Sequence, residues 1–123
     1  MKKSGILNPD LSYALARLGH TDMWAIADCG LPIPDHVEVI DLALVFGIPT
    51  FAQVSAAILD EVVVEGVILA EQTPAEIREL LPSEVEEITH EELKKLLGEC
   101  AFVVRTGDTT AYANAVFKAG VAF

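Results

Sequence analysis

The hydrophobic pattern of this chain changes its period repeatedly, from helical spacing to short apolar runs and back. Residues 11–18 place apolar side chains three or four positions apart, the spacing of one buried helix face. Asn8 is a favourable N-cap, Pro9 suits the first helical position, and Gly19 suits the position that follows a helix. These features predict an amphipathic helix over 9–18, with Gly19 as its C-terminal cap.

Later segments alternate in the same way between strand and helix patterns. The clearest strand is 62–70, which is rich in β-branched residues. Thr73 with Glu76, and Thr89 with Glu92, match the capping box, in which both side chains accept hydrogen bonds from backbone N–H groups. Pro49 is expected near the first position of another helix. The predicted strands are 23–28, 37–44, 62–70, 85–88, 101–105 and 116–123, and the further helices are 49–59, 73–81 and 89–97.

This order of elements predicts the α/β class, with a largely parallel or mixed sheet flanked by helices. A length of 123 residues, with no long linker, internal repeat or low-complexity stretch, predicts one domain that spans 1–123.

The chain is unusually apolar for its length. Hydrophobic residues make up 52% of it and the mean hydropathy is +0.43. A monomer of this size buries only about two thirds of its unfolded surface. Exposed apolar patches are therefore expected unless other subunits cover them, which favours a homo-oligomer over a monomer with a dense core.

Charge and cysteine content limit the partners and the location that we expect. Eight Lys and Arg against 19 Asp and Glu give a net charge of −11, which argues against nucleic-acid binding. No apolar run approaches the roughly 18 residues of a membrane span. Residues 1–5 lack the apolar core of a secretion signal, and Cys29 and Cys100 are expected to be reduced core thiols. We therefore expect a cytoplasmic protein that does not bind membranes.

The three histidines, His20, His36 and His90, are the side chains that titrate near neutral pH. His20 comes directly after the predicted first helix and before a strand, a position that suits a structural or a functional role equally. His36 is expected to be a solvated loop residue. His90 falls in the first turn of a helix, where the positive end of the helix dipole favours neutral imidazole, and by position alone it is a surface residue.

Four other polar residues near element ends are candidates for binding a small ligand. Asp28 ends an apolar strand, where ligands of open α/β sheets gather, although it could equally cap the following turn. At such ends His20 and Asp28 are expected to reach one small polar ligand. Lys94 shares a helix face with His90, or is simply solvated. Tyr112 and Asn114 can donate hydrogen bonds to sugar hydroxyls and accept hydrogen bonds from them. Alternatively, their side chains form hydrogen bonds only within their own loop.

Common metal, nucleotide and nucleophile motifs are missing from the sequence. It contains no CxxC, HExxH, GxSxG or Walker pattern, and its acidic runs lack the spacing of a calcium loop. Three histidines far apart in the sequence leave a zinc site possible but unsupported.

Six segments, taken together and in order, resemble the D-ribose pyranase family, small sugar mutarotases that include the fucose mutarotases. They are LNPDLSYALARLGHTD (7–22), ADCGLPIP (27–34), IDLALVFGIPTFAQV (40–54), VEGVILAE (64–71), THEELK (89–94) and RTGDTTAYANAVFKAGVAF (105–123). The series covers nearly the whole chain and is more specific than any single fragment. LPIP and THEELK favour the ribose branch over the fucose-type branch. The stretch between Glu71 and Thr89 is shorter than in longer family members.

The resemblance implies that the protein interconverts the pyranose and furanose forms of β-D-ribose without a metal or organic cofactor. In that interpretation His20 of GHTD is the catalytic histidine and shuttles a proton, and Asp28 orients either His20 or a sugar hydroxyl. The implied sugar-binding residues are Asp28, His90, Tyr112 and Asn114, with Lys94 as an addition from the same helix. The resemblance also implies a ring-shaped homo-oligomer, a pentamer or two stacked pentamers, with sites at subunit boundaries. A fucose-type mutarotase and a non-catalytic sugar-binding protein are the alternatives.

Overall fold

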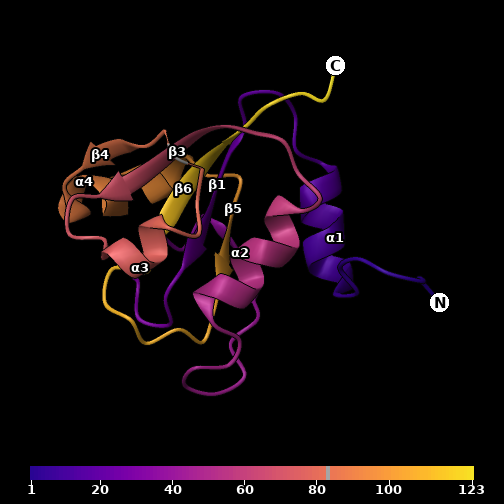
Figure 1. Cartoon of the computed structure of the whole chain (residues 1–123), viewed down its shortest axis with the longest axis horizontal. Helices are drawn as coiled ribbons and strands as arrows, with labels where there is room; N and C mark the ends of the chain where they lie inside the picture. The colour runs from indigo at the N-terminus through magenta and orange to yellow at the C-terminus, as the bar shows by residue number, and fades with distance from the viewer. Residues whose placement is uncertain (83) are drawn as a thin grey trace.

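The computed structural model describes residues 1–82 and 84–123, and in them one sheet lies between helices (Figure 1). The helices are α1 (Pro9–Ala16), α2 (Phe51–Leu59), α3 (Ala75–Arg78), α4 (His90–Leu96) and the 3-10 turn η1 (Leu97–Glu99). The strands are β1 (Met23–Ala27), β2 (Glu38–Asp41), β3 (Val64–Ala70), β4 (Glu86–Ile88), β5 (Phe102–Arg105) and β6 (Ala115–Ala119). The predicted α/β class is confirmed.

The six-stranded sheet is mixed, as predicted, and its strand order is β2-β5-β1-β6-β3-β4. β1 pairs with β5 in parallel, β5 with β2 in parallel, and β3 with β4 in parallel, whereas β6 is antiparallel to both β1 and β3. The parallel strands therefore end at one edge of the sheet, where β6 begins. We call this the carboxyl edge, and the opposite edge, where β6 ends, the amino edge.

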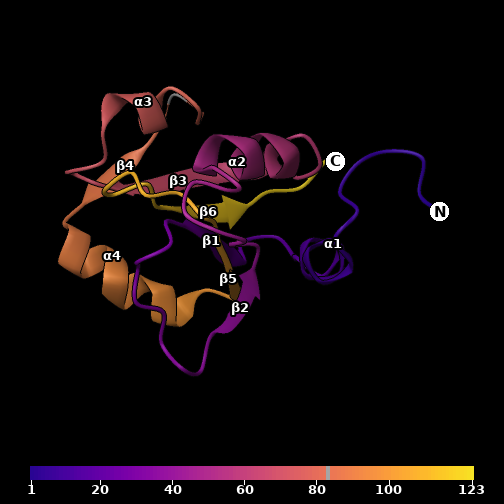
Figure 2. The same cartoon turned by 90° about the horizontal axis from the view of Figure 1, so that it is seen from below.

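Helices cover both faces of this sheet (Figure 2). On one face α1, α2 and α3 pack over a core in which Trp24 is fully buried. Its ring stacks on Phe117 at 4.4 Å and on Phe102 at 6.0 Å between centroids. On the other face Leu93 and Leu97 of α4 and η1 contribute to a second apolar core. Both faces of the central strands are thus buried, which leaves the sheet edges as the places for polar chemistry.

Two predicted helix starts are wrong. The helix α2 begins after Thr50, whose side chain and that of Gln53 form a reciprocal capping box, so Pro49 lies before the cap. The predicted box at Thr73 does not form because Thr73 belongs to the turn after β3, where its N–H donates to the Ala70 carbonyl. Pro74 is the N-cap of α3 and provides no capping side chain.

Other boundaries also differ from prediction, each for a local reason. The helix α1 ends at Ala16, because the Gly19 N–H donates instead to the Asp22 carboxylate in a separate turn. The left-handed residue of this turn is Thr21, with φ of 73°, and not Gly19.

Cys29 lies half-buried in the loop after β1, so the prediction of two core thiols holds only for Cys100. The predicted box at Thr89 is confirmed.

The start of α2 depends on a buried carboxylate, and its removal is expected to destabilise the fold. Asp108 accepts hydrogen bonds from the backbone N–H groups of Phe51 and Thr110, at 2.8 Å each. Replacing Asp108 by alanine leaves both donors without this partner, so the free energy of unfolding should fall by about 1–3 kcal/mol in urea denaturation at pH 7. Asp35→Ala, at an exposed position, is the control and should be neutral.

The same carboxylate should make stability depend on pH. Burial by itself raises the pKa of Asp108, but the hydrogen bonds from Phe51 and Thr110 outweigh it and hold the pKa below the ordinary 3.8. The stabilisation is therefore complete above pH 3.8 and is lost as the pH falls through the lowered pKa. The gap between wild type and Asp108→Ala should shrink in acid, and a gap that stays constant would contradict a role for the charge.

Candidate active site

Four of the six predicted site residues line one open groove of about 350 Å³ at the carboxyl edge. Asp28 follows β1, His90 and Lys94 belong to α4, and Tyr112 precedes β6. They meet because β1 and β4 end at this edge, while the antiparallel β6 starts there. The wall of the groove is completed by Gly30, Leu31, Pro32 and Ala111.

Asn114 fixes the orientation of Asp28 from behind the groove. The Asp28 N–H donates to Asn114 Oδ1 at 2.8 Å, and Asn114 Nδ2 donates to Asp28 Oδ2 at 3.1 Å. The Gly30 N–H donates to the other carboxylate oxygen, Oδ1, at 2.9 Å. Asn114 is 1% exposed and does not line the groove. In this chain Asn114 therefore acts on Asp28, and direct contact of Asn114 with a sugar stays a prediction.

His90 and Tyr112 also line the groove, and their rings pack against each other. Their rings meet edge to face, with centroids 5.0 Å apart and planes at 85°. Tyr112 has a φ of 62°, which is rare for a bulky side chain, and strain of this kind gathers at functional sites. His90 Nδ1 is buried without a hydrogen-bond partner among residues 1–82 and 84–123. Nε2 is therefore the ring nitrogen left to serve a ligand.

Lys94 brings a cation to the groove, but its charge is shared. Its ammonium group donates to Glu91 Oε1 at 2.9 Å, one turn earlier on α4. That hydrogen bond holds the pKa of Glu91 below its usual value. A ligand at this end of the groove would meet an ion pair and not an isolated ammonium group.

His20 lies away from the groove, at the amino edge. Its turn is tied to the end of β6, since the Thr21 N–H donates to the Ala119 carbonyl at 2.9 Å and the Ala119 N–H donates to the Asp22 backbone carbonyl at 2.8 Å. The five residues of β1 separate this turn from Asp28, and a strand rises about 3.3 Å per residue, so the gap is roughly 17 Å. The expectation that His20 and Asp28 reach one small ligand is therefore wrong within a single chain.

At the amino edge His20 has its own charged partners, which the sequence analysis missed. His20 Nε2 lies 2.8 Å from Glu65 Oε2, and Lys118 Nζ lies 3.4 Å from Glu65 Oε1. The hydrogen bond from His20 is the main cause that lowers the pKa of Glu65. Each of these two partners is the sole charged residue of an apolar strand, β3 or β6, and that pattern was the available signal.

Arg105, also missed, braces the loop that carries Asp28. Its Nε and Nη2 donate to the Cys29 carbonyl at 3.2 and 3.0 Å, and its Nη1 donates to Asp41 at 2.9 Å. One guanidinium thus joins the ends of β5 and β2 to the residue after Asp28. The signal for it was an arginine at the end of an apolar strand.

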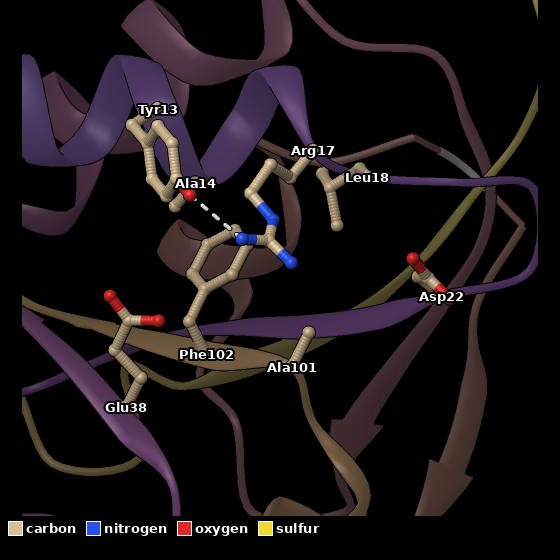
Figure 3. Close-up of a pocket in the computed structure, with 8 residues that line it drawn as sticks. All are labelled: Tyr13, Ala14, Arg17, Leu18, Asp22, Glu38, Ala101 and Phe102. Carbon is tan, nitrogen blue, oxygen red and sulfur yellow. Dashed lines mark hydrogen bonds between the residues drawn. The ribbon is translucent and has the colours of Figure 1, made fainter.

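A second hollow, of about 230 Å³, lies between α1 and the sheet and contains none of the predicted site residues (Figure 3). Arg17 of this hollow donates to the Tyr13 hydroxyl at 2.7 Å, and its guanidinium lies 5.4 Å from the centre of the Tyr13 ring. Glu38 and Phe102 line the opposite side (Figure 3). The groove at the carboxyl edge holds four of the six predicted site residues and is therefore the better candidate for the ligand site.

Three further observations concern metals, membranes and thiols. In the part of the chain that the structure describes, no three His, Cys, Asp or Glu side chains gather as a metal site, and no helix has the length and apolar character to cross a membrane. Burial raises the pKa of the Cys100 thiol to about 12, which leaves it protonated and unreactive at neutral pH.

Known proteins share both the sequence and the fold of this chain. The model of the RbsD / FucU transport protein family matches residues 1–122. The D-ribose pyranase of Corynebacterium glutamicum (strain R) is 72% identical over 123 residues, which are 100% of both chains. The solved structure of Bacillus subtilis RbsD complexed with D-ribose covers 100% of both chains, with 45% identity and a TM-score of 0.93.

A structure of much lower sequence identity has a similar fold. The fucose mutarotase in complex with L-fucose from Streptococcus pneumoniae has a TM-score of 0.78 but 19% identity, over 95% of each chain, and so shares the fold alone. The family model and the relative at 72% identity, in contrast, extend over essentially the whole sequence. They confirm the resemblance seen in the motifs, and this chain belongs to the RbsD / FucU transport protein family.

Proposed function

We propose that this protein is a sugar mutarotase that interconverts the pyranose and furanose forms of D-ribose. The observation that carries the proposal is the polar groove of Asp28, His90 and Tyr112, in a chain 72% identical to a D-ribose pyranase. The bound ribose of the B. subtilis relative, at 45% identity, supports the choice of sugar. The L-fucose-binding relative, at 19% identity, gives no comparable support for fucose.

The groove offers groups suited to a ring of hydroxyls. Asp28 supplies a carboxylate held in place by Asn114 and Gly30, which can accept from a sugar hydroxyl. His90 and Tyr112 supply a ring nitrogen and a phenol. Tyrosine also offers an aromatic face to the C–H groups of a sugar. Two walls that are fixed before the ligand arrives reduce the entropy lost on binding.

The reaction itself needs only proton transfer and positioning. Ring opening of the hemiacetal takes the proton from the anomeric hydroxyl and delivers one to the ring oxygen. The aldehyde then rotates, and a different hydroxyl attacks it, with the reverse proton movements. In our proposal His20 shuttles these protons, while Asp28 and His90 hold hydroxyls. General acid–base catalysis of this kind contributes about 10²- to 10⁴-fold.

We further propose that each site is completed by a second copy of the chain, in a ring-shaped pentamer or two stacked pentamers. His20 at the amino edge and Asp28 at the carboxyl edge meet only if one subunit packs its amino edge against the carboxyl edge of the next. Such a head-to-tail contact is heterologous, and a heterologous contact generates a ring when the rotation between neighbouring subunits closes.

Exposed apolar side chains at both edges support this packing. At the carboxyl edge the uncharged loop 42–50 projects from the molecule (Figure 1), and its Phe46 is 85% exposed. The conformation of this loop is fixed by two backbone hydrogen bonds. The Gly47 N–H donates to the Gly107 carbonyl at 2.6 Å, and the Gly107 N–H donates to the Pro49 carbonyl. Val121 and Phe123 are exposed at the opposite end. Because a net charge of −11 opposes self-association, uncharged surfaces such as these are the favourable places for contact between copies.

The free thiols of Cys29 and Cys100 fit a reducing compartment, and we propose the cytoplasm as the location.

The test is NMR saturation transfer between the anomeric protons of D-ribose and, separately, of L-fucose, with and without the protein. Faster pyranose–furanose exchange of ribose than in buffer is the expected result. Faster exchange of fucose alone would contradict the ribose reaction and indicate a fucose-type mutarotase. Binding of ribose without faster exchange would contradict catalysis and leave a sugar-binding protein.

A further inference from the structure

We infer that Glu65 is the positioning residue of His20: it accepts the hydrogen bond of Nε2 and so leaves Nδ1 as the ring atom that exchanges protons with the sugar. The inference rests on the proposed function, in which His20 is the proton shuttle. His20 Nε2 lies 2.8 Å from Glu65 Oε2.

The direction of this hydrogen bond follows from the chemistry of the two groups. The pKa of Glu65 lies below its usual value, mainly because of the hydrogen bond to His20, so Glu65 is a carboxylate at neutral pH. A carboxylate has only acceptors, so Nε2 must carry the hydrogen. In neutral imidazole one ring nitrogen is then a donor and the other, Nδ1, holds the lone pair. The side chain of His20 is 52% exposed, so a sugar held by a second subunit can reach it.

The backbone of β3 is irregular at the residue that makes this contact. Val64 pairs with Ala119 and Gly66 pairs with Lys118, so two steps on β3 match a single step on β6. Glu65 is the extra residue of this β-bulge and has no partner of its own across the ladder. Bulges re-aim side chains and are over-represented beside active sites. Here the bulge places a carboxylate beside His20, in a strand with no other charged residue.

Lys118 holds the same carboxylate from the other side. Its ammonium group lies 3.4 Å from Glu65 Oε1, while His20 occupies Oε2. With one oxygen facing a cation and the other facing the imidazole, rotation of the carboxylate costs both contacts. The nearby Asp22 carboxylate is engaged elsewhere, since its Oδ2 accepts from the Gly19 N–H at 2.8 Å. Glu65 is therefore the carboxylate that sets the state of His20.

A purely structural role would be small at this position. Glu65 and His20 are both substantially exposed, and exposed ion pairs contribute little to stability. Glu65 variants are therefore expected to fold. A change in catalysis or in the histidine tautomer would then report positioning, and not a damaged fold.

The experiment compares Glu65→Ala and Glu65→Gln with Glu87→Gln. The control removes a carboxylate from the Arg78–Glu87 pair, which is similarly exposed and lies outside the proposed site. Three quantities are measured for each protein: kcat and KM for ribose exchange, the ¹⁵N shifts of the His20 ring, and the urea midpoint. The ring shifts report which nitrogen carries hydrogen, whether or not the protein is active.

Glu65→Ala is expected to lower kcat on the order of 10- to 100-fold, with KM changed by less than about twofold, because orientation and not binding is lost. Its His20 ring should become a mixture of tautomers. Glu65→Gln keeps an acceptor oxygen, so it should retain the hydrogen on Nε2 and lose less kcat than the alanine variant. Glu87→Gln should match wild type in kcat and in ring shifts.

Two failures are distinguishable. If wild type does not accelerate exchange, or His20→Ala retains it, the proposed function or the role of His20 is wrong. If wild type is active and His20→Ala is not, but both Glu65 variants keep wild-type kcat and ring shifts, the inference about Glu65 is overturned. Should the alanine variant not fold, the glutamine variant decides by the same comparison.

Discussion

Replacement of His20 by alanine is expected to lower the rate of ribose exchange about 10²- to 10⁴-fold and to leave the protein folded. The loss follows because the other histidine at the amino edge, His36, precedes β2, two strands away from β1, and contacts the Gly98 carbonyl. The fold should persist because the His20 turn is held by backbone hydrogen bonds of Thr21 and Ala119, which the substitution does not touch. Saturation transfer measures the rate, and urea unfolding measures the stability.

His36→Ala is the matched control. His36 is an exposed histidine whose Nε2 contacts the Gly98 carbonyl at 3.0 Å, in a loop outside the proposed site. It should keep the wild-type rate. A folded His20→Ala protein with full exchange activity would show that His20 is not the proton shuttle. That result would not test the role of the groove at the carboxyl edge.

The pH profile separates the two members of the His20–Glu65 pair. If neutral His20 is needed in one step, protonation of its ring on acidification should slow the exchange. The hydrogen bond from His20 lowers the pKa of Glu65, so this carboxylate is lost only in stronger acid than an ordinary glutamate. A rate that does not fall on acidification would contradict the histidine as shuttle.

The sequence predicted the elements of this fold because their signals are local. Period, N-caps and β-branched runs act within a few residues, and the box at Thr89 with Glu92 formed as expected. The capping box predicted at Thr73 did not form, because Thr73 is part of the turn after β3. The order β2-β5-β1-β6-β3-β4 depends on pairings between distant segments, which no local pattern encodes.

The groove could be predicted from the sequence because its residues lie next to strand ends. The separation of His20 from the groove could be predicted in the same way, but its contact with Glu65 could not. Asp28, His90 and Tyr112 follow or precede strands, and the ends of parallel strands share one edge. A residue before β1 and a residue after it must lie at opposite edges, which already separates His20 from Asp28. The contact with Glu65 was not predictable, because it depends on a bulge in β3 and on the pairing of β3 with β6.

Mixing two inactive variants is expected to restore activity, because each proposed site takes His20 from one subunit and Asp28 from the next. The pair is His20→Ala and Asp28→Asn, and each alone should be inactive. Asparagine keeps the size of the side chain, although one of the two donors at Asn114 and Gly30 loses its acceptor. The two chains are refolded together in equal amounts, and exchange is compared with each variant alone.

The expected recovery is about one quarter of the wild-type rate, since random mixing around a ring leaves one site in four with both intact residues. A site built within one chain predicts no recovery at any ratio, and the roughly 17 Å along β1 makes that arrangement inaccessible without a large change in the fold. Mixing His20→Ala with Glu87→Gln controls for dilution, because there the Glu87→Gln chains supply every intact His20. Recovery in the test mixture would locate the reaction between subunits, and its absence from a folded, mixed oligomer would confine it to one chain.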